Sequence, residues 1–555
     1  MRLLPFSPAI PWRRRGVDAA VGALGALGMA PLYVWPATLA SLAWLALRLV
    51  GRGDWRAGFS TGFWAGFGFF AAGMFWIAQA FVERGPEYIP LIVPLVLGLF
   101  WLLALFWGAA GAAFVALRAR GGAEGSVGLS AREAFLFAAL FFLAEWARGH
   151  AFGGFPWNLA GYAWEPGTPL SQAASWAGVW GLTLWMWVLA GLLAAGWARR
   201  RAAPRRAGAL GAVAAAALVL QGGWGMWRLE TTALPPDVDG VRLRLVHVPF
   251  RQRDMMDLEQ SVGITNAYFR ETLARPLDGG GEGEGGAEGR PVTHIVWPEG
   301  AVRDLAADNP SFLGVLPQFL DAPPDFLFTS IRVERGPSAD YPGGGTRYFN
   351  TGVSVGYADG GGAGSGGGVP AVQAFADKHR LVPFGETVPG GGVLEALGLE
   401  ALAASFTPAP GKATARYPGL PPVSVRICYE VLFAGLAPLG EARAPWILNQ
   451  SNDAWFGGLH GPAQHAGVAR MRALEEGVGL VRAAANGESG TVDALGRWRV
   501  RMGREARGSV DVAIPGALPP TPFRGWIDRV WALLCLLWVA IAAVVGFGKY
   551  RRFQE

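Results

Sequence analysis

Long apolar runs constrain this chain more than any other feature. A spanning helix needs roughly 17–25 predominantly apolar residues. Segments of about that length, two of them short, are Val17–Tyr33, Pro36–Val50, Gly58–Phe81, Tyr88–Leu117, Ala134–Ala147, Ala173–Ala198, Ala207–Trp227 and Ile527–Gly548. Only 16% of the 555 residues are charged, against roughly 25% in soluble domains. We therefore predict a polytopic α-helical membrane domain with eight transmembrane helices.

Positive charge alternates between the connecting segments. Arginine-rich segments precede the first run and follow the second, fourth and sixth, and Lys549, Arg551 and Arg552 follow the last. The other short loops carry little excess positive charge. By the positive-inside rule both termini are cytoplasmic, and the long segment from about Arg228 to Asp528 lies outside the cytoplasm. Because the arginines sit at run ends, they favour lipid headgroups as partners and argue against nucleic acid.

The chain therefore divides into three parts. Residues 1–227 form a transmembrane domain of seven helices, residues 228–524 an extracytoplasmic domain, and residues 525–555 the last transmembrane helix and a cytoplasmic tail. Short strands alternate with helices near Asp257–Leu273 and Ala463–Glu476, which favours a layered α/β domain. The strand candidates are Val241–Val248, His294–Trp297, Phe326–Val333, Gly352–Gly356, Val423–Cys428, Trp446–Asn449, Gly479–Ala484, Gly490–Ala494 and Gly508–Ala513. Two glycine-rich stretches, Asp278–Gly289 and Asp359–Gly368, are predicted to be flexible surface insertions.

The helical part is open to more than one interpretation. It could be a plain anchor, but eight spans exceed what tethering needs and favour a role in presenting a lipid. The aromatic loop from Gly153 to Trp164 is typical of a membrane interface and could also line a lipid entry. A transporter is a further possibility. Ionisable residues within the spans mark transport pathways, and apart from Glu145 and Arg148 the runs contain few of them, which argues against this interpretation.

Cys428 is one of only two cysteines, and the other, Cys535, lies in the last apolar run. Cys428 closes the alternating run Val423–Cys428 and is followed by Tyr429 and Glu430. A thiol at a strand end beside a carboxylate is a candidate nucleophile. A small buried hydrophobe is an equally open interpretation.

Two further chemical groups follow strand-like segments. Glu299 comes directly after His294–Trp297 in a Pro-Gly turn, and the segment Phe375–Glu386 carries Lys378 and Glu386. Each alone could be a turn residue, a solvated charge or a salt-bridge partner. Together with Cys428 they can converge where loops build sites. Glu299 could then act as a general base, and Lys378 could stabilise a thiolate and an oxyanion.

Several motifs resemble one superfamily. Trp297-Pro298-Glu299, the block from Lys378 to Glu386 and Ile427-Cys428-Tyr429-Glu430, in this order, resemble the nitrilase, or carbon–nitrogen hydrolase, superfamily. With the apolar runs, the chain is similar to its membrane-embedded branch, the apolipoprotein N-acyltransferases. The segments Asn449–Gly457 and Gln464–Glu475 also resemble that family.

This resemblance implies a fold and site residues. The outer domain would be a nitrilase-like αββα sandwich carrying a Glu-Lys-Cys triad of Glu299 as base, Lys378 as oxyanion stabiliser and Cys428 as nucleophile. The resemblance also implies supporting roles for Glu386, Tyr429 and Glu430, and a substrate-side role for Asn350. No metal or organic cofactor is required by these groups.

The resemblance further implies a reaction and a location. A phospholipid acyl donor would acylate Cys428 as a thioester, and the N-terminal amine of a diacylglyceryl apolipoprotein would accept the chain, with ping-pong kinetics. The protein would be a multi-pass component of a bacterial inner membrane with a periplasmic catalytic domain. The alternative is a membrane-tethered nitrilase or amidase acting on a small amide or nitrile.

Two segments depart from the family pattern. Val246–Gln252 lacks the tryptophan expected to follow the first strand, which puts a substrate-gating tryptophan in doubt. Ala485–Gly490 also differs from the family and is expected to be a loop variation away from the chemistry.

Overall fold

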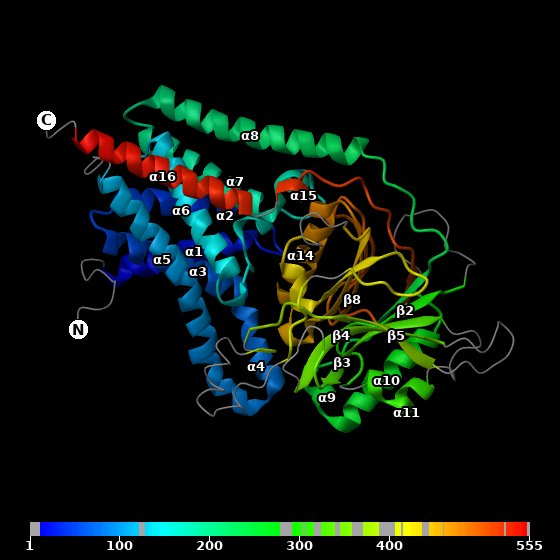
Figure 1. The fold of residues 1–555 in the computed structure, drawn as a ribbon. Helices are drawn as coiled ribbons and strands as arrows, with labels where there is room; N and C mark the ends of the chain where they lie inside the picture. Colours follow the sequence, from blue (N-terminus) through cyan, green and yellow to red (C-terminus); the bar gives the residue numbers. More distant parts are fainter. Residues whose placement is uncertain are drawn as a thin grey trace. The chain divides into compact units, whose positions relative to one another are not determined.

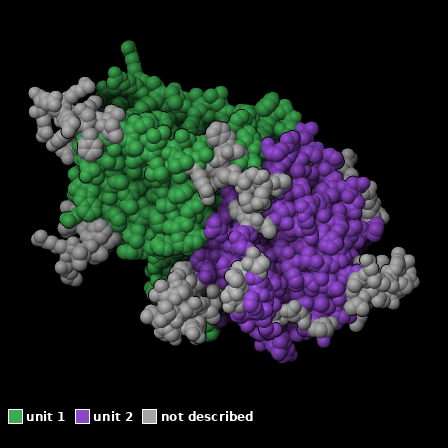
Figure 2. Space-filling model, in the orientation of Figure 1, with its two compact units in different colours: residues 1–82, 86–232, 521–555 green, residues 83–85, 233–520 purple. Residues whose placement is uncertain are grey.

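A computed structural model describes residues 11–120, 128–277, 291–303, 306–315, 324–338, 345–357, 370–383, 385–387, 406–411, 414–435, 443–458, 460–526 and 529–551. The chain divides into two compact units (Figure 2). The helical unit comprises residues 1–82, 86–232 and 521–555, and the α/β unit comprises residues 83–85 and 233–520. The glycine-rich stretches predicted at Asp278–Gly289 and around Asp359–Gly368 lie outside the described residues.

The helical unit consists mainly of helices, with a long irregular connection from Ala151 to Ala173 (Figure 1). Its helices are α1 (Trp12–Gly25), α2 (Trp35–Val50), α3 (Trp55–Met74), α4 (Gln79–Arg84), α5 (Leu97–Arg120), α6 (Ala131–His150), α7 (Ala174–Arg199), α8 (Pro204–Thr231), α15 (Phe523–Trp526) and α16 (Arg529–Arg551). Side-chain caps set two of their starts. Asp54 accepts a hydrogen bond from the backbone of Ala57, and Ser130 with Glu133 forms a capping box.

Glycine allows a close helix contact in this unit. A Cβ atom on Gly58 of α3 would lie 2.6 Å from the carbonyl oxygen of Gly111 of α5, and one on Gly111 would lie 2.5 Å from the oxygen of Gly58. No side chain fits there. Small residues of this kind let helix backbones approach each other where both are apolar, so α3 and α5 pack backbone against backbone.

The expected count of eight transmembrane helices is not confirmed. Within the described residues, five helical segments are long and apolar enough to cross a membrane: Trp55–Arg84, Pro86–Arg120, Ala131–Gly153, Pro169–Arg199 and Pro204–Thr231. The other three predicted runs are also helical, but their apolar parts are shorter. They correspond to α1 of 14 residues, α2 of 16 residues and the segment Val530–Ala543 of α16.

Helix α1 is less apolar than its run suggested because it begins at Trp12 and so includes Arg13, Arg14 and Arg15 as well as the buried carboxylate of Asp18. Asp18 is 1% exposed and forms ion pairs with Arg48 of α2, at 3.0 Å, and with Arg52, at 3.4 Å. The helix then ends at Gly25. The first run is therefore partly a polar helix whose charge is balanced by its neighbour.

The α/β unit contains two mixed sheets. The first has the strand order β11-β1-β2-β3-β4-β5, and the second has the order β10-β9-β8-β7-β6. Strands β1, β2 and β3 are parallel, as are β6, β7 and β8, and the remaining pairs are antiparallel. The strands are β1 (Leu243–His247), β2 (His294–Val296), β3 (Asp325–Arg335), β4 (Thr346–Tyr357), β5 (Pro370–Asp377), β6 (Val423–Ile427), β7 (Trp446–Asn452), β8 (Gly479–Ala485), β9 (Ser489–Val492), β10 (Trp498–Met502) and β11 (Gly508–Val512).

Two apolar cores hold this unit in layers. One core packs helix α10 (Leu258–Leu273), through Tyr268 and Phe269, against Trp297 and neighbouring residues of the first sheet. The other lies between the sheets and joins Leu245 to Leu448. Helix α14 (His460–Glu476) packs on the second sheet. Figure 1 shows α10 beside the first sheet with α9 (Gln252–Met256) and α11 (Pro310–Val315).

The predicted strands all correspond to strands of the structure, with ends shifted by a few residues. Two strands were not predicted: β5 and β10. β5 is rich in alanine and half-exposed on its sheet edge, and β10 alternates arginine with apolar residues next to glycine-rich turns. Neither reads as a buried strand from local pattern alone.

Candidate active site

Three strand ends carry the predicted reactive groups. Glu299 follows β2, Lys378 follows β5 directly, and Cys428 follows β6 directly. Strands β2 and β5 belong to the first sheet and β6 belongs to the second. Side chains at the carboxyl ends of strands can meet at one end of a layered domain, and in this structure they do. We call Glu299, Asn350, Lys378, Glu386 and Cys428 the thiol cluster.

The carboxyl group of Glu299 lies at the centre of the thiol cluster. Its Oε1 accepts a hydrogen bond from Asn350 Nδ2 at 2.9 Å and lies 3.8 Å from Lys378 Nζ. Its Oε2 accepts a hydrogen bond from the backbone N–H of Asn452, at the end of β7, at 3.0 Å. The Cys428 side chain also hydrogen-bonds this carboxyl group. Glu299 therefore links both sheets to the thiol.

Lys378 is the most buried charged group of the thiol cluster, with 1% of its side chain exposed. Its Nζ donates to Glu386 Oε1 at 2.9 Å, and the same oxygen accepts from Asn350 Nδ2 at 2.8 Å. The other oxygen of Glu386 accepts from the backbone of Val382 at 2.9 Å. Glu386 thus fixes the ammonium and the amide that both contact Glu299.

Cys428 has an unusual backbone conformation. Its φ angle is +49°, in the left-handed region that residues other than glycine seldom adopt. Its side chain is 8% exposed. Such a conformation persists only where surrounding contacts hold it, and it is common at functional sites. The sharp turn places the thiol at the end of β6 instead of continuing the strand.

Electrostatics set the charge state of each group. Burial, assisted by the Glu386 carboxylate and opposed by Lys378, raises the pKa of Glu299 above its ordinary value. Burial and the Glu299 charge raise the pKa of the Cys428 thiol well above its ordinary value, although Lys378 opposes this. Burial alone would lower the pKa of Lys378, but the carboxylates of Glu386 and Glu299 outweigh it and raise that pKa. The resting site therefore combines a neutral thiol with an ammonium.

Glu430 and Tyr429 lie next to Cys428 but are not part of the thiol cluster. Glu430 bonds backbone groups, and Tyr429 packs on a neighbouring ring. Glu430, 2% exposed, accepts hydrogen bonds from the backbone of Ile427 at 2.9 Å and of His379 at 2.7 Å. It therefore ties the turn that carries Cys428 to the turn that carries Lys378. Tyr429 is 4% exposed and its ring packs edge-to-face on Phe433, with centroids 5.4 Å apart.

Sequence reasoning missed the residues that support Glu299 from the second sheet. Asn452 donates its backbone N–H to Glu299, and its side chain donates to Gln252 Oε1 at 2.8 Å. Gly300 has φ +80°, and a Cβ atom there would lie 2.5 Å from Asn452 Nδ2. The sequence offered one signal, because the block containing Asn452 resembles the family without an assigned role.

The two segments that depart from the family pattern meet in the structure. The backbone N–H of Phe250 donates to Asn486 Oδ1 at 2.7 Å. A Cβ atom on Gly487 would lie 2.2 Å from Asp453 Oδ2. Asp453 begins the turn after β7, one residue beyond Asn452. The segment Ala485–Gly490 is therefore closer to the site than expected.

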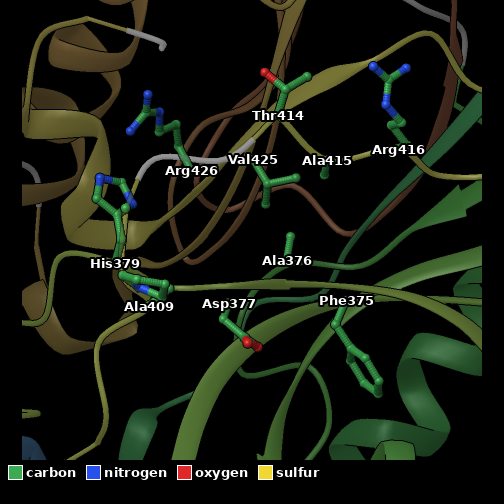
Figure 3. A pocket seen from close by; sticks show the side chains of 12 residues that line it. Phe375, Ala376, Asp377, His379, Ala409, Thr414, Ala415, Arg416, Val425 and Arg426 are labelled. Carbon is green, nitrogen blue, oxygen red and sulfur yellow. The ribbon is translucent and has the colours of Figure 1, made fainter. Parts of the chain in front are cut away.

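A separate cavity of about 430 Å³ lies between the first and second sheets at their β5 and β6 edges (Figure 3). Asp377 and His379 line it from the β5 side, Arg426 from β6, and Thr414 from the connecting segment. Its described lining includes none of the seven predicted site residues. In the described parts of the chain, no group of three or more His, Cys, Asp or Glu residues is placed to hold a metal ion.

Comparison with protein families defines the class of this chain. The family model described as "Apolipoprotein N-acyltransferase N-terminal domain" matches residues 21–192. The description "Carbon-nitrogen hydrolase" matches residues 372–518, a range that includes Lys378 and Cys428. The class is therefore a helical region joined to a carbon–nitrogen hydrolase domain.

Curated relatives match nearly the whole chain. Proteins named apolipoprotein N-acyltransferase are 31% identical in Rhodopseudomonas palustris, over 97% of this chain and 96% of the relative, and 32% identical in Caulobacter vibrioides, with the same coverage. The one from Brucella melitensis is 34% identical, over 98% of this chain and 97% of its own length. The chain belongs to the apolipoprotein N-acyltransferase family.

Proposed function

We propose that this protein transfers an acyl chain from a membrane phospholipid to the N-terminal amine of the diacylglyceryl-cysteine of apolipoproteins. One observation carries the proposal: a buried thiol, a carboxyl group and an ammonium meet on three strand ends of a carbon–nitrogen hydrolase domain. The near full-length similarity to proteins named apolipoprotein N-acyltransferase supports it. In this proposal Glu299, Lys378 and Cys428 form a catalytic triad.

In the first half-reaction, Cys428 gives its proton to the Glu299 carboxylate while Sγ attacks the ester carbonyl carbon of the phospholipid. A C–S bond forms, and the carbonyl oxygen takes negative charge that the Lys378 ammonium stabilises. The ester C–O bond then breaks. The leaving oxygen takes the proton from Glu299, which releases a lysophospholipid and leaves a thioester on Cys428.

In the second half-reaction, the acceptor amine attacks the thioester carbonyl carbon. A C–N bond forms, and Lys378 again stabilises the oxyanion. Glu299 takes a proton from the nitrogen and returns it to the Cys428 sulfur as the C–S bond breaks. The products are an amide and the free thiol. Splitting one transfer into two steps produces ping-pong kinetics.

The other predicted residues hold this arrangement. Glu386 positions the Lys378 ammonium, and Asn350 bridges Glu386 to Glu299 by hydrogen bonds of 2.8 and 2.9 Å. Glu430 joins the turns that carry Lys378 and Cys428. Tyr429, next to the nucleophile in the chain, packs its ring on Phe433. Asn350 is also partly exposed and is proposed to face the substrate.

The proposed setting is a bacterial inner membrane. The five span-length helices and the three shorter ones would together make eight crossings, with residues 1–227 and 525–555 forming the membrane part. The positive-inside rule then makes both termini cytoplasmic and the domain 228–524 periplasmic. A reporter fused after Glu555 tests this topology, and an extracytoplasmic signal would contradict it.

Mass spectrometry tests the chemistry directly. The purified protein is incubated with phospholipid in the absence of acceptor, and the expected result is one added acyl group on the peptide containing Cys428. Cys428→Ala should show no adduct and no transfer. Cys535→Ala is the matched control, because Cys535 is the other buried thiol and should be dispensable. An adduct that persists in Cys428→Ala would sink the assignment.

The amidase alternative makes a different prediction, since water would be its acceptor and lipid would be unnecessary. The relatives reported above do not support it, because each is named an apolipoprotein N-acyltransferase. Turnover of a small amide or nitrile by the full chain in detergent without phospholipid would favour the alternative.

A further inference from the structure

His465 contacts the turn that carries Cys428. It projects from α14, and its side chain is completely buried. Its Nε2 lies 3.1 Å from the backbone carbonyl oxygen of Cys428, and its Nδ1 lies 2.7 Å from Asp453 Oδ1. Ser451 Oγ is farther from Nδ1, at 3.5 Å, and the ring of Phe456 packs edge-on against the imidazole. One imidazole therefore joins two turns that follow β6 and β7.

The partners of His465 determine where its protons are. The Cys428 carbonyl oxygen can only accept a hydrogen bond, so Nε2 must donate. Burial would raise the pKa of Asp453, but Arg482 and His465 outweigh it and lower that pKa, so Asp453 is a carboxylate. Nε2 therefore carries a proton, and Nδ1 faces the Asp453 carboxylate.

The surrounding groups fix the orientation of the imidazole ring. Asp453 Oδ2 accepts from Arg482 Nη2 at 2.6 Å while Oδ1 faces His465. Arg482 also donates to Asn449 and to the carbonyl oxygen of Glu488. Buried charges persist where they are paired and hydrogen-bonded. The carboxylate thus lies between Arg482 and His465, and Nε2 of His465 faces the Cys428 carbonyl oxygen.

The backbone of Cys428 needs such a contact. Its left-handed conformation is unfavourable for a residue with a side chain and must be held by its surroundings. Glu430 holds the preceding peptide through the N–H of Ile427. His465 holds the carbonyl group of Cys428 itself. The two contacts fix the turn on both sides of the Cα atom that carries the thiol.

We propose that His465 is a positioning residue for the nucleophile: its Nε2–H bond to the Cys428 carbonyl holds the turn that presents the thiol to Glu299. This inference rests on the proposed role of Cys428 as acyl carrier. His465 touches neither the reacting atoms nor the substrate in this role. It acts only through the backbone of Cys428, with Asp453 fixing the orientation of its ring.

A pair of variants separates this role from simple pairing with Asp453. His465→Gln can place an amide N–H near the position of Nε2, whereas His465→Asn can place one near the position of Nδ1. We expect His465→Asn to slow single-turnover formation of the Cys428 thioester by about 10- to 100-fold, with the half-saturating phospholipid concentration unchanged within about twofold. His465→Gln should form the thioester at least about fivefold faster than His465→Asn. A Gln-to-Asn rate ratio below about two overturns the proposal.

His247→Asn is the matched control. His247 is equally buried in the same unit, with its ring bonded to Ser489 Oγ at 2.9 Å and to the carbonyl oxygen of Arg504 at 3.2 Å. Its loss should cost similar packing but leave thioester formation within about twofold of the unmodified protein. If His247→Asn slows the step as much as His465→Asn, the effect is one of general destabilisation and the proposal fails.

Nitrogen NMR tests the same geometry without any substitution in the measured protein. In protein carrying ¹⁵N-labelled histidine, Nε2 of His465 should have the shift typical of a protonated nitrogen. The ring of His247, whose pKa is lowered by burial, should show one unprotonated nitrogen. An unprotonated Nε2 in His465 would overturn the proposal. If the unmodified protein instead forms no thioester, the proposed function fails while this measurement still decides the state of His465.

Discussion

Each of the two units buries a polar cluster, and the two clusters differ in their balance of positive and negative groups. In the helical unit, Arg148 and Glu145 form an ion pair, and Arg148 Nη1 also donates to the carbonyl oxygens of Phe155, at 2.6 Å, and Trp157, at 2.9 Å. Glu145 accepts a further bond from the indole of Trp107. This helical cluster balances one cation with one anion.

The thiol cluster of the α/β unit has a different balance. Two carboxyl groups, Glu299 and Glu386, share one ammonium, Lys378, and one of them also hydrogen-bonds Cys428. The extra carboxyl group has a raised pKa and can exchange a proton with the thiol. A buried pair of one cation and one anion can hold a structure together. A cluster of two carboxyl groups and one ammonium beside a thiol is suited to chemistry. The helical pair therefore does not require a transport role.

The largest expected effect is loss of the proposed base. Glu299→Gln keeps the shape of the side chain but cannot accept the thiol proton, so thioester formation should fall by about 10²–10⁴-fold. Stopped reactions analysed by mass spectrometry measure the rate. Glu145→Gln, the equivalent change in the helical cluster, is the control and should leave the rate per folded molecule unchanged. Equal losses in both variants would erase the distinction between the clusters.

Loss of the ammonium should have the next largest effect. Lys378→Met retains most of the side-chain volume but removes the charge proposed to stabilise the oxyanion, so thioester formation should slow by roughly 10²–10³-fold. Without the ammonium the two carboxyl groups also repel each other, which should raise the pH needed for activity. A rate within about threefold of the unmodified protein would exclude Lys378 as the oxyanion stabiliser.

Breaking the helical pair should reduce stability and leave the chemistry intact. Arg148→Met leaves the Glu145 carboxylate buried without its cation, which typically costs about 3–5 kcal/mol. Unfolding of the protein in detergent measures the change. Arg200→Met is the control, because Arg200 is exposed over Trp197 and its loss should change the free energy of unfolding by less than about 0.5 kcal/mol. A similarly small change for Arg148→Met would contradict the importance of the pair.

The pH profile of thioester formation should reflect the unequal charges. Glu299 must be ionised to accept a proton, and its pKa is raised above the ordinary value of 4.5. The rate should therefore fall about tenfold for each pH unit below that raised pKa. Because Glu386 raises that pKa, Glu386→Gln should move the acid limb to lower pH. A shift to higher pH would mean that Glu386 acts mainly through Lys378.

The smallest expected effect concerns the support from the second sheet. Gln252→Leu removes the acceptor of the Asn452 side chain but leaves the backbone bond from Asn452 to Glu299. We expect a two- to fivefold slower thioester formation, consistent with loss of a buried hydrogen bond near the site. Gln260→Leu, on the exposed face of α10, is the control and should have no effect. A hundredfold loss would make Gln252 part of the chemistry.

Much of the site could be predicted from local sequence. Cys428 and Glu299 each follow a short buried run of strand-forming residues, so their positions at strand ends were readable. Lys378 was found by its motif although β5 itself was not predicted. The strand is half-exposed on a sheet edge and lacks the apolar pattern of a buried strand.

The supporting contacts could not be predicted from sequence. Asn452 reaches Glu299 across 153 positions of chain, and His465 reaches Cys428 from a helix that follows a different strand. Neither contact leaves a periodic signal, because each depends on which strands become neighbours. The left-handed conformation of Cys428 was also unreadable, since it is imposed by Glu430 and His465 and not by the residue type.

The sequence by itself determined an apolar helical part, an α/β part and the chemical groups at three strand ends. These follow from local hydrophobic periodicity and from residue type, which act over a few positions. Only the tertiary structure decided that Glu299 is shared between Asn350, Asn452 and the Cys428 thiol, and that α1 is tied to α2 through Asp18. Burial and charge pairing set those features, and both depend on contacts between distant segments.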